Sequence, residues 1–214
     1  CKSPTVRALS FTGSTKAGIS LAEQAASTVK KVSLELGGNA SFIVFDDADI
    51  DDAVKGALAA KFRNSGQTCV CTNRILVQDG VYEQFVDRLV TAAAALKMGD
   101  GLDPNTDQGP LVNEGAVDDV ERLVALSTAA GATVALGGAR SDLGPCFYQP
   151  TILTDVTPDM AVFRNEIFGP VAPVTVFHDE SEAIALANDT EFGLAAYFYT
   201  VSYTHLTLPT NCVV

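Results

Sequence analysis

The chain has 214 residues, of which 47% are hydrophobic and 19% are charged, so it contains enough apolar side chains for a sizeable buried core. Its net charge of −12 and its scattered basic residues argue against a cationic surface for nucleic acid. Because an acidic protein repels anions at long range, a substrate with a carboxylate would need one specifically placed arginine.

The cysteines and the apolar runs bear on the cellular setting. Five cysteines, at positions 1, 69, 71, 146 and 212, are too few and too irregularly spaced for a secreted disulfide framework, which predicts a reducing, cytoplasmic setting. No apolar run reaches the roughly 18 residues that a membrane-spanning helix needs, so no membrane partner is expected. The chain starts at Cys1 without Met, and we expect its true start to be missing.

The first residues predict a strand, a glycine turn and a helix, followed by a second strand. The strand is expected over 6–11, the turn over 12–15 and the helix over 16–28. Apolar and polar residues alternate over 32–36, which is the period of a strand and turns Glu35 away from its apolar neighbours.

The remaining elements continue this alternation. Further strands are expected at 41–45, at 74–78, near 134, 152 and 174, and at 194–199. Helices are expected at about 46–62, where aspartates supply N-caps, and at 82–97, 114–130 and 181–188. Strands that alternate with crossover helices predict an α/β fold with a mostly parallel sheet.

The composition changes after Thr200. The stretch 201–214 has three threonines, no acidic residue and no helix signal. It fits an edge strand with a proline stop, but we favour the hypothesis that it is a non-native tail resembling translated adaptor sequence.

Two side chains are candidates for a nucleophile and a base. Cys69 ends the loop Gly66-Gln-Thr-Cys69, where glycine allows a ligand to approach the backbone, and Glu35 precedes a double-glycine turn one βα unit earlier. Active-site groups of α/β sheets gather on loops at the carboxyl ends of strands. A lone cysteine is more often a small buried thiol and a lone glutamate in such a strand more often solvated, and spacing by itself does not establish Cys69 and Glu35 as a catalytic pair.

Two other kinds of site are less well supported. A Cys/His hydrolase needs a histidine base, and the sequence offers only His178 and His205. A zinc site built from Cys69, Cys71, Cys146 and His178 would lack regular paired spacing, so no metal is expected.

Five short motifs follow one another along the chain: Phe11-Thr-Gly-Ser14, Leu34-Glu-Leu-Gly-Gly38, Gly66-Gln-Thr-Cys69, Gly109-Pro-Leu111 and Glu166-Ile-Phe-Gly-Pro170. In their order and separation they resemble the aldehyde dehydrogenase superfamily over about 4–200. Three further stretches resemble the succinate-semialdehyde dehydrogenase subgroup: Lys61-Phe-Arg-Asn-Ser-Gly-Gln-Thr-Cys-Val-Cys71, Gly99-Asp-Gly101 and Asn188-Asp-Thr-Glu-Phe-Gly-Leu-Ala-Ala-Tyr-Phe198.

The resemblance implies a fold and a reaction. It implies a remnant of the NAD(P)-binding domain over 1–35 and a catalytic domain over 36–200. Cys69 would attack the aldehyde carbon, hydride would pass to NAD or NADP, and Glu35 would activate the water that hydrolyses the thioester. The Cys69 N–H would hold the oxyanion together with an asparagine that lies upstream of this chain.

The resemblance also assigns binding residues, each with an ordinary alternative. Gly13 and Ser14 would lie beside the cofactor pyrophosphate, although Ser14 could simply cap a helix. Glu166 would bind the nicotinamide-side ribose and Phe168 would pack on the nicotinamide; otherwise they are a surface acid and a core aromatic. Arg63 would bind the substrate carboxylate, or else be a solvated helix end.

One further cysteine is a redox candidate. Cys71 could form a regulatory disulfide with Cys69, as in some members of the subgroup, or be a buried spectator thiol. Because much of the nucleotide-binding domain is absent, we expect the 214-residue chain alone to be inactive and the full-length protein to be a homo-oligomer. The alternatives are a noncatalytic remnant with partial nucleotide affinity and a dehydrogenase for another semialdehyde, such as glutarate semialdehyde.

Overall fold

A computed structural model describes residues 1–202, and the chain divides into two compact units between Gly38 and Asn39. The stretch 203–214, which holds most of the predicted non-native tail, lies outside the described residues. Among the helices of residues 1–202, none is both long enough and apolar enough to cross a membrane.

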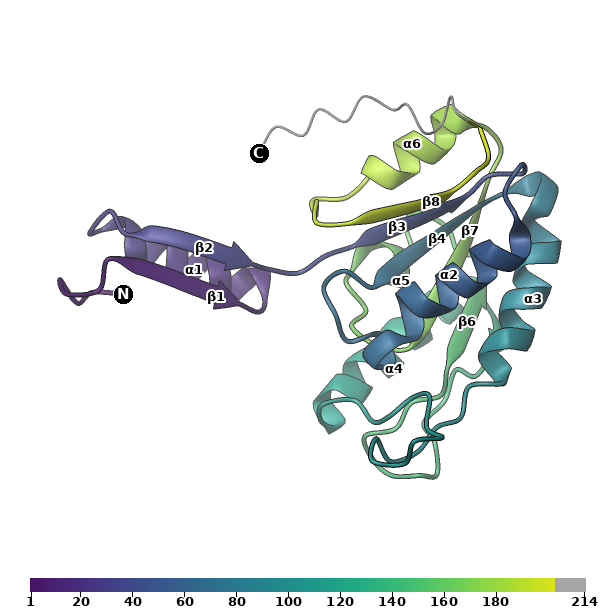
Figure 1. Ribbon diagram of the computed structural model, residues 1–214, viewed down its shortest axis with the longest axis horizontal. Helices are drawn as coiled ribbons and strands as arrows, with labels where there is room; N and C mark the ends of the chain where they lie inside the picture. Colours follow the sequence, from purple (N-terminus) through teal and green to yellow (C-terminus); the bar gives the residue numbers. More distant parts are fainter. Residues whose placement is uncertain (203–214) are drawn as a thin grey trace. The chain divides into compact units, whose positions relative to one another are not determined.

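The first unit is a single βαβ arrangement. Strand β1 (Ala8–Thr12) pairs in parallel with β2 (Lys31–Glu35), and helix α1 (Thr15–Ala26) connects them (Figure 1). Gly18 of α1 packs closely against Leu36, which follows β2, because a Cβ at Gly18 would lie 2.4 Å from the Leu36 side chain.

The second unit is built on a six-stranded sheet (Figure 1). All neighbouring strands in it are parallel except β5 and β6, so the predicted α/β class with a mostly parallel sheet is confirmed. The strands run in the order β5 (Thr133–Leu136), β6 (Thr151–Thr154), β7 (Val171–Phe177), β4 (Thr72–Gln78), β3 (Ala40–Val44) and β8 (Ala196–Tyr199).

Helices cover both faces of this sheet. The side chains of Asp49, Asn113 and Asp179 accept hydrogen bonds at the N-termini of three of them, which stabilises each helix start. The helical segments of the unit are α2 (Ile50–Phe62), η1 (Arg63–Gly66), η2 (Asp79–Val81), α3 (Tyr82–Ala94), α4 (Glu114–Ala129), α5 (Ala161–Arg164) and α6 (Glu180–Asn188).

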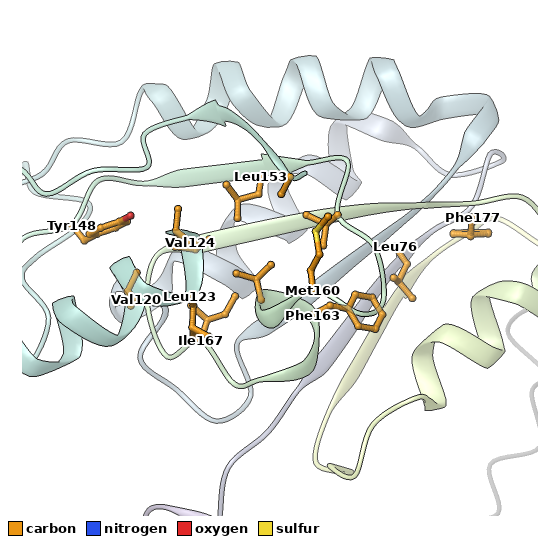
Figure 2. Packing of buried hydrophobic residues seen from close by; sticks show 14 of the residues in the cluster. Leu76, Val120, Leu123, Val124, Tyr148, Leu153, Met160, Phe163, Ile167 and Phe177 are labelled. Carbon is orange, nitrogen blue, oxygen red and sulfur yellow. The ribbon is translucent and has the colours of Figure 1, made fainter. Parts of the chain in front are cut away.

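The two faces carry two separate apolar clusters, because successive side chains of a strand point to opposite sides. Ile75 and Val77 of β4 pack with α2 and α3, whereas Leu76 packs with α4 and α5 on the other face. Burial on both faces explains why three successive residues of β4, Ile75 to Val77, are apolar. Figure 2 shows ten labelled members of the second cluster: Leu76, Val120, Leu123, Val124, Tyr148, Leu153, Met160, Phe163, Ile167 and Phe177.

Every strand and helix predicted from the sequence is present, with ends displaced by a few residues. The third helix ends at Ala94 rather than near 97, and the last strand starts at Ala196 rather than at 194. Helix α5 was not predicted, because four residues make one turn and carry no helical periodicity.

Candidate active site

The loop that precedes Cys69 has an unusual backbone. Asn64, Ser65 and Gly66 have φ angles of 52°, 55° and 76°, in the left-handed region. This conformation costs about 1–2 kcal/mol for each residue that has a Cβ. Three left-handed residues in a row form a tight reversal between α2 and the cysteine, so the loop must be stabilised by its surroundings.

The Gly109–Leu111 motif supplies part of that stabilisation. The Ser65 hydroxyl donates to the Gly109 carbonyl over 2.8 Å, and Gln67 Oε1 accepts from the Val112 N–H over 2.8 Å. Gln67 Nε2 also donates to the Asn64 carbonyl over 3.1 Å. The motif therefore holds the strained loop in place.

Gly66 brings this loop against the segment that carries Glu166 and Phe168. A Cβ on Gly66 would lie 2.1 Å from the Gly169 carbonyl oxygen, so the two backbones touch where only glycine fits. Two motifs that are distant in the sequence are thus neighbours in the structure.

Cys69 lies at the amino end of β4, three residues before the strand begins at Thr72. The expectation that active-site groups gather at the carboxyl ends of strands is therefore wrong for this residue. Its thiol is free and half-buried, and it sits in a turn closed by a 3.0 Å hydrogen bond from the Cys71 N–H to the Thr68 carbonyl. A half-buried thiol in a turn is accessible to a small molecule.

Cys71 has the contacts of a buried thiol. It is 6% exposed, its Sγ lies 2.8 Å from the Thr68 hydroxyl, and it donates to the Arg63 carbonyl over 3.7 Å. Both Cys69 and Cys71 are free in this structure. These contacts match the spectator alternative, and a disulfide between the two cysteines would have to break them.

Arg63 directly follows α2 and is the first residue of the 3₁₀ turn η1, where it is exposed to solvent. Its guanidinium forms no ion pair or hydrogen bond with any residue in the described part of the chain. A cation without an internal partner, six residues before Cys69, is available to an anionic ligand.

Glu166 and Phe168 precede β7, the strand beside β4. Glu166 is half-buried, and Phe168 has a φ of 50° and is 42% exposed. Phe168 is therefore not a core aromatic, because it is partly open to solvent on a strained backbone. An exposed aromatic next to a carboxylate can hold the ring and the sugar of a nucleotide.

The first unit places its own predicted residues side by side. The Gly13 N–H donates to the Glu35 carbonyl over 3.0 Å, and Thr12 lies opposite Glu35 in the strand register. Ser14 is the N-cap of α1 and accepts from the Ala17 N–H over 3.3 Å. The cap interpretation of Ser14 is thus correct, and the helix N-terminus beside it still suits an anion.

A histidine base at His178 does not fit this geometry, and His205 lies outside the described residues. His178 follows the carboxyl end of β7 and lies 3.1 Å from the Asp79 carboxylate, which raises the histidine pKa. Cys69 lies at the amino end of the adjacent parallel strand β4, so His178 and Cys69 lie at opposite ends of the sheet. Within residues 1–202, no three His, Cys, Asp or Glu side chains gather as metal ligands would.

The burial of two polar residues near the site, Lys61 and Arg74, was not predicted from the sequence. Lys61 is 1% exposed, and burial lowers its pKa to about 8, although the nearby Glu166 carboxylate opposes that shift. Its spacing from Ala53, Val54 and Ala57 puts it on the apolar face of α2, a signal that could have revealed its burial.

Arg74 of β4 is also buried, at 1% exposure. It donates to the carbonyls of Asn39, Leu186 and Ala187 and lies over the Phe163 ring, 5.1 Å from its centroid. Burial lowers the arginine pKa to about 10. An arginine in a strand gives no sequence signal of such a role.

Comparisons with known proteins match nearly the whole chain. The family model described as the aldehyde dehydrogenase family matches residues 1–208. A relative from Escherichia coli (strain K12), named as an NADP(+) succinate-semialdehyde dehydrogenase, is 59% identical over 196 residues, which are 92% of this chain and 41% of the relative. A glutarate-semialdehyde dehydrogenase of Pseudomonas aeruginosa is 57% identical, with 92% and 41% covered.

The fold is also similar to a solved structure. The crystal structure of an E. coli NADP-dependent enzyme superposes with a TM-score of 0.94 at 57% identity, over 95% of this chain and 42% of that one. The chain therefore spans about two fifths of the length of the relatives that it matches.

Proposed function

The chain belongs to the aldehyde dehydrogenase family, and from this we propose that the whole protein oxidises an aldehyde to a carboxylic acid with NAD or NADP. We propose succinate semialdehyde as the substrate, with Cys69 as the nucleophile and Glu35 as the base. The relatives named above act on semialdehydes according to their names, which supports the substrate class. In this proposal the first unit belongs to the nucleotide-binding domain and the second to the catalytic domain.

The contact between Gly66 and Gly169 is the observation that carries this proposal. It places the loop that leads to Cys69 beside the segment with Glu166 and Phe168, at the amino ends of β4 and β7. An aromatic ring, a carboxylate and a nucleophilic thiol on adjoining segments are what a nicotinamide and an aldehyde need together.

The cofactor fits the residues present in each unit. The N-terminus of α1, next to Gly13 and Ser14, offers free backbone N–H groups to a pyrophosphate. The exposed aromatic residue Phe168 and the carboxylate of Glu166 offer a stacking surface and a ribose acceptor. When bound, NAD or NADP supplies the hydride acceptor.

The chain's own residues account for the remaining steps. The Cys69 thiolate attacks the aldehyde carbon, and its backbone N–H stabilises the resulting oxyanion. Loss of hydride from that carbon leaves a thioester on Cys69. Glu35 accepts a proton from water as the water attacks the thioester, which releases the acid and returns the thiolate.

Arg63 gives this reaction its preference for an acidic aldehyde. Its guanidinium, which has no partner among residues 1–202, can bind the far carboxylate of a semialdehyde through charge-assisted hydrogen bonds. Succinate and glutarate semialdehydes both carry such a group, so glutarate semialdehyde is the second candidate, and a relative of that name supports it. We further propose that the complete protein is a cytoplasmic homo-oligomer.

The test uses the complete protein encoded by the source gene. NADH and NADPH formation is measured with succinate semialdehyde, glutarate semialdehyde and a neutral aldehyde. We expect an acidic aldehyde to be preferred and Cys69→Ala to abolish turnover. Cys146→Ala is the matched control, because Cys146 is another free, half-buried cysteine. No turnover with any pair of aldehyde and cofactor would favour the noncatalytic remnant.

A further inference from the structure

A single buried side chain holds the backbone on both sides of Glu166. Asn73 lies in β4 and is 3% exposed. Its Oδ1 accepts from the Ile167 N–H over 2.9 Å, and its Nδ2 donates to the Asn165 carbonyl over 2.8 Å. The two main-chain groups that flank Glu166 are thus both bound to one side chain.

Only an amide side chain can make this pair of contacts. A planar amide presents an acceptor and a donor at fixed separation, whereas a carboxylate lacks the donor and a hydroxyl is too short to reach both groups. The orientation of the amide is determined as well, because a backbone N–H can only donate and a backbone carbonyl can only accept. Asn73 therefore binds the 165–167 segment as a neighbouring strand would.

Two further buried residues fix Asn73 itself. Asn39 Oδ1 accepts from Asn73 Nδ2 over 2.7 Å, and Asn39 Nδ2 donates to the Phe163 carbonyl over 3.2 Å. The carbonyl of Asn39 accepts from Arg74 Nε over 3.1 Å and from Arg74 Nη2 over 2.9 Å. A connected buried network of this kind has one arrangement and is rigid.

We propose that Asn73 is a positioning residue for the cofactor. By holding the peptide groups before and after Glu166, it sets the direction of that carboxylate. The inference rests on the proposed cofactor role of Glu166. Asn73 acts through Glu166 and touches neither the aldehyde nor the reacting atoms.

The experiment compares Asn73→Ala with Ser127→Ala in the complete enzyme. The Ser127 hydroxyl is fully buried and accepts from the Val162 N–H over 3.1 Å, so its loss also removes a buried contact to the same stretch of chain, but upstream of Asn165. We expect Asn73→Ala to raise the KM and the Kd of the cofactor about tenfold, while the aldehyde KM changes less than twofold. Ser127→Ala should leave both constants unchanged.

A double-mutant cycle distinguishes positioning from general destabilisation. If Asn73 acts through Glu166, Asn73→Ala has no further effect on cofactor affinity in a Glu166→Ala background. Additive effects, or an equal loss in the Ser127→Ala variant, would overturn the inference. Far-UV circular dichroism checks that each variant is folded, and Asn73→Ser replaces Asn73→Ala if the alanine variant does not fold.

The failure of this inference can be separated from failure of the proposed function. If the unaltered enzyme turns over and Glu166→Ala weakens cofactor binding, but Asn73→Ala does not, only the positioning role is wrong. If the unaltered enzyme neither binds nor reduces NAD or NADP, the proposed function fails first.

Discussion

Replacement of the buried Lys61 by methionine should stabilise the protein. Lys61 is 1% exposed, and no carboxylate among residues 1–202 forms an ion pair with it. A buried ammonium group loses hydration on folding, and the nearby Glu166 offsets only part of that loss, whereas a methionine of similar shape carries no charge to desolvate. The Lys61→Met variant therefore removes a penalty without opening a cavity.

The size of this effect follows from the pKa. Burial lowers the pKa of Lys61 from 10.5 to about 8. At about 1.4 kcal/mol for each pKa unit, folding with the charged lysine costs about 3 kcal/mol at neutral pH. Between pH 8 and 10.5 the unfolded chain binds more protons than the folded one, so wild-type stability rises with pH and the penalty disappears.

The assay is unfolding in urea at pH 7 and at pH 10, with Lys55→Met as the control. Lys55 lies on the same helix, but it is exposed and pairs with Asp52 over 2.9 Å. We expect Lys61→Met to raise the unfolding midpoint at pH 7 and to differ little from wild type at pH 10. A Lys61→Met protein that is less stable than Lys55→Met at pH 7 would refute the reasoning.

Three further predictions concern the site in the complete enzyme. Gly66→Ala should lower kcat/KM about a hundredfold, because its Cβ would displace the backbone that meets it and shift the nucleophile by about an ångström; Gly101→Ala, with open space around its Cβ, is the control, and equal activity of the two variants would contradict the contact. Arg63→Leu should raise the KM for succinate semialdehyde about tenfold or more and leave a neutral aldehyde unaffected, since a charge-assisted hydrogen bond contributes about 1.5–3 kcal/mol; equal effects on both substrates would remove Arg63 from recognition. Cys71→Ala should leave reversible inactivation by peroxide unchanged, because its thiol is buried and already hydrogen-bonded; loss of reversibility would support a disulfide with Cys69.

The sequence predicted the elements well because local signals and burial agree in this chain. Of the aspartates near the start of α2, Asp49 caps the helix, and the apolar run of β3 is a buried strand. Short α5 escaped prediction because a single turn has no period. Cys69 follows α2 and precedes β4, in the order of elements that the sequence predicts, but the general rule that active-site groups lie at the carboxyl ends of strands does not describe it.

The supporting residues of the site could not be predicted from the sequence. Asn73 and Arg74 look like ordinary polar residues of a strand, and their role depends on carbonyls from distant parts of the chain. The contact of Gly66 with Gly169 likewise joins two motifs that the sequence presents separately. Local sequence patterns predict the helices and strands, whereas the contacts between distant polar groups depend on the tertiary fold.

The most direct test of the account is to trap the acyl group on Cys69. In the complete enzyme, Glu35→Gln should block hydrolysis while leaving thioester formation possible. After incubation with succinate semialdehyde and cofactor, we expect mass spectrometry to find a succinyl group on the peptide that contains Cys69. A succinyl group on another cysteine, or a Glu35→Gln enzyme that turns over normally without accumulating any adduct, would contradict the assignment of nucleophile and base.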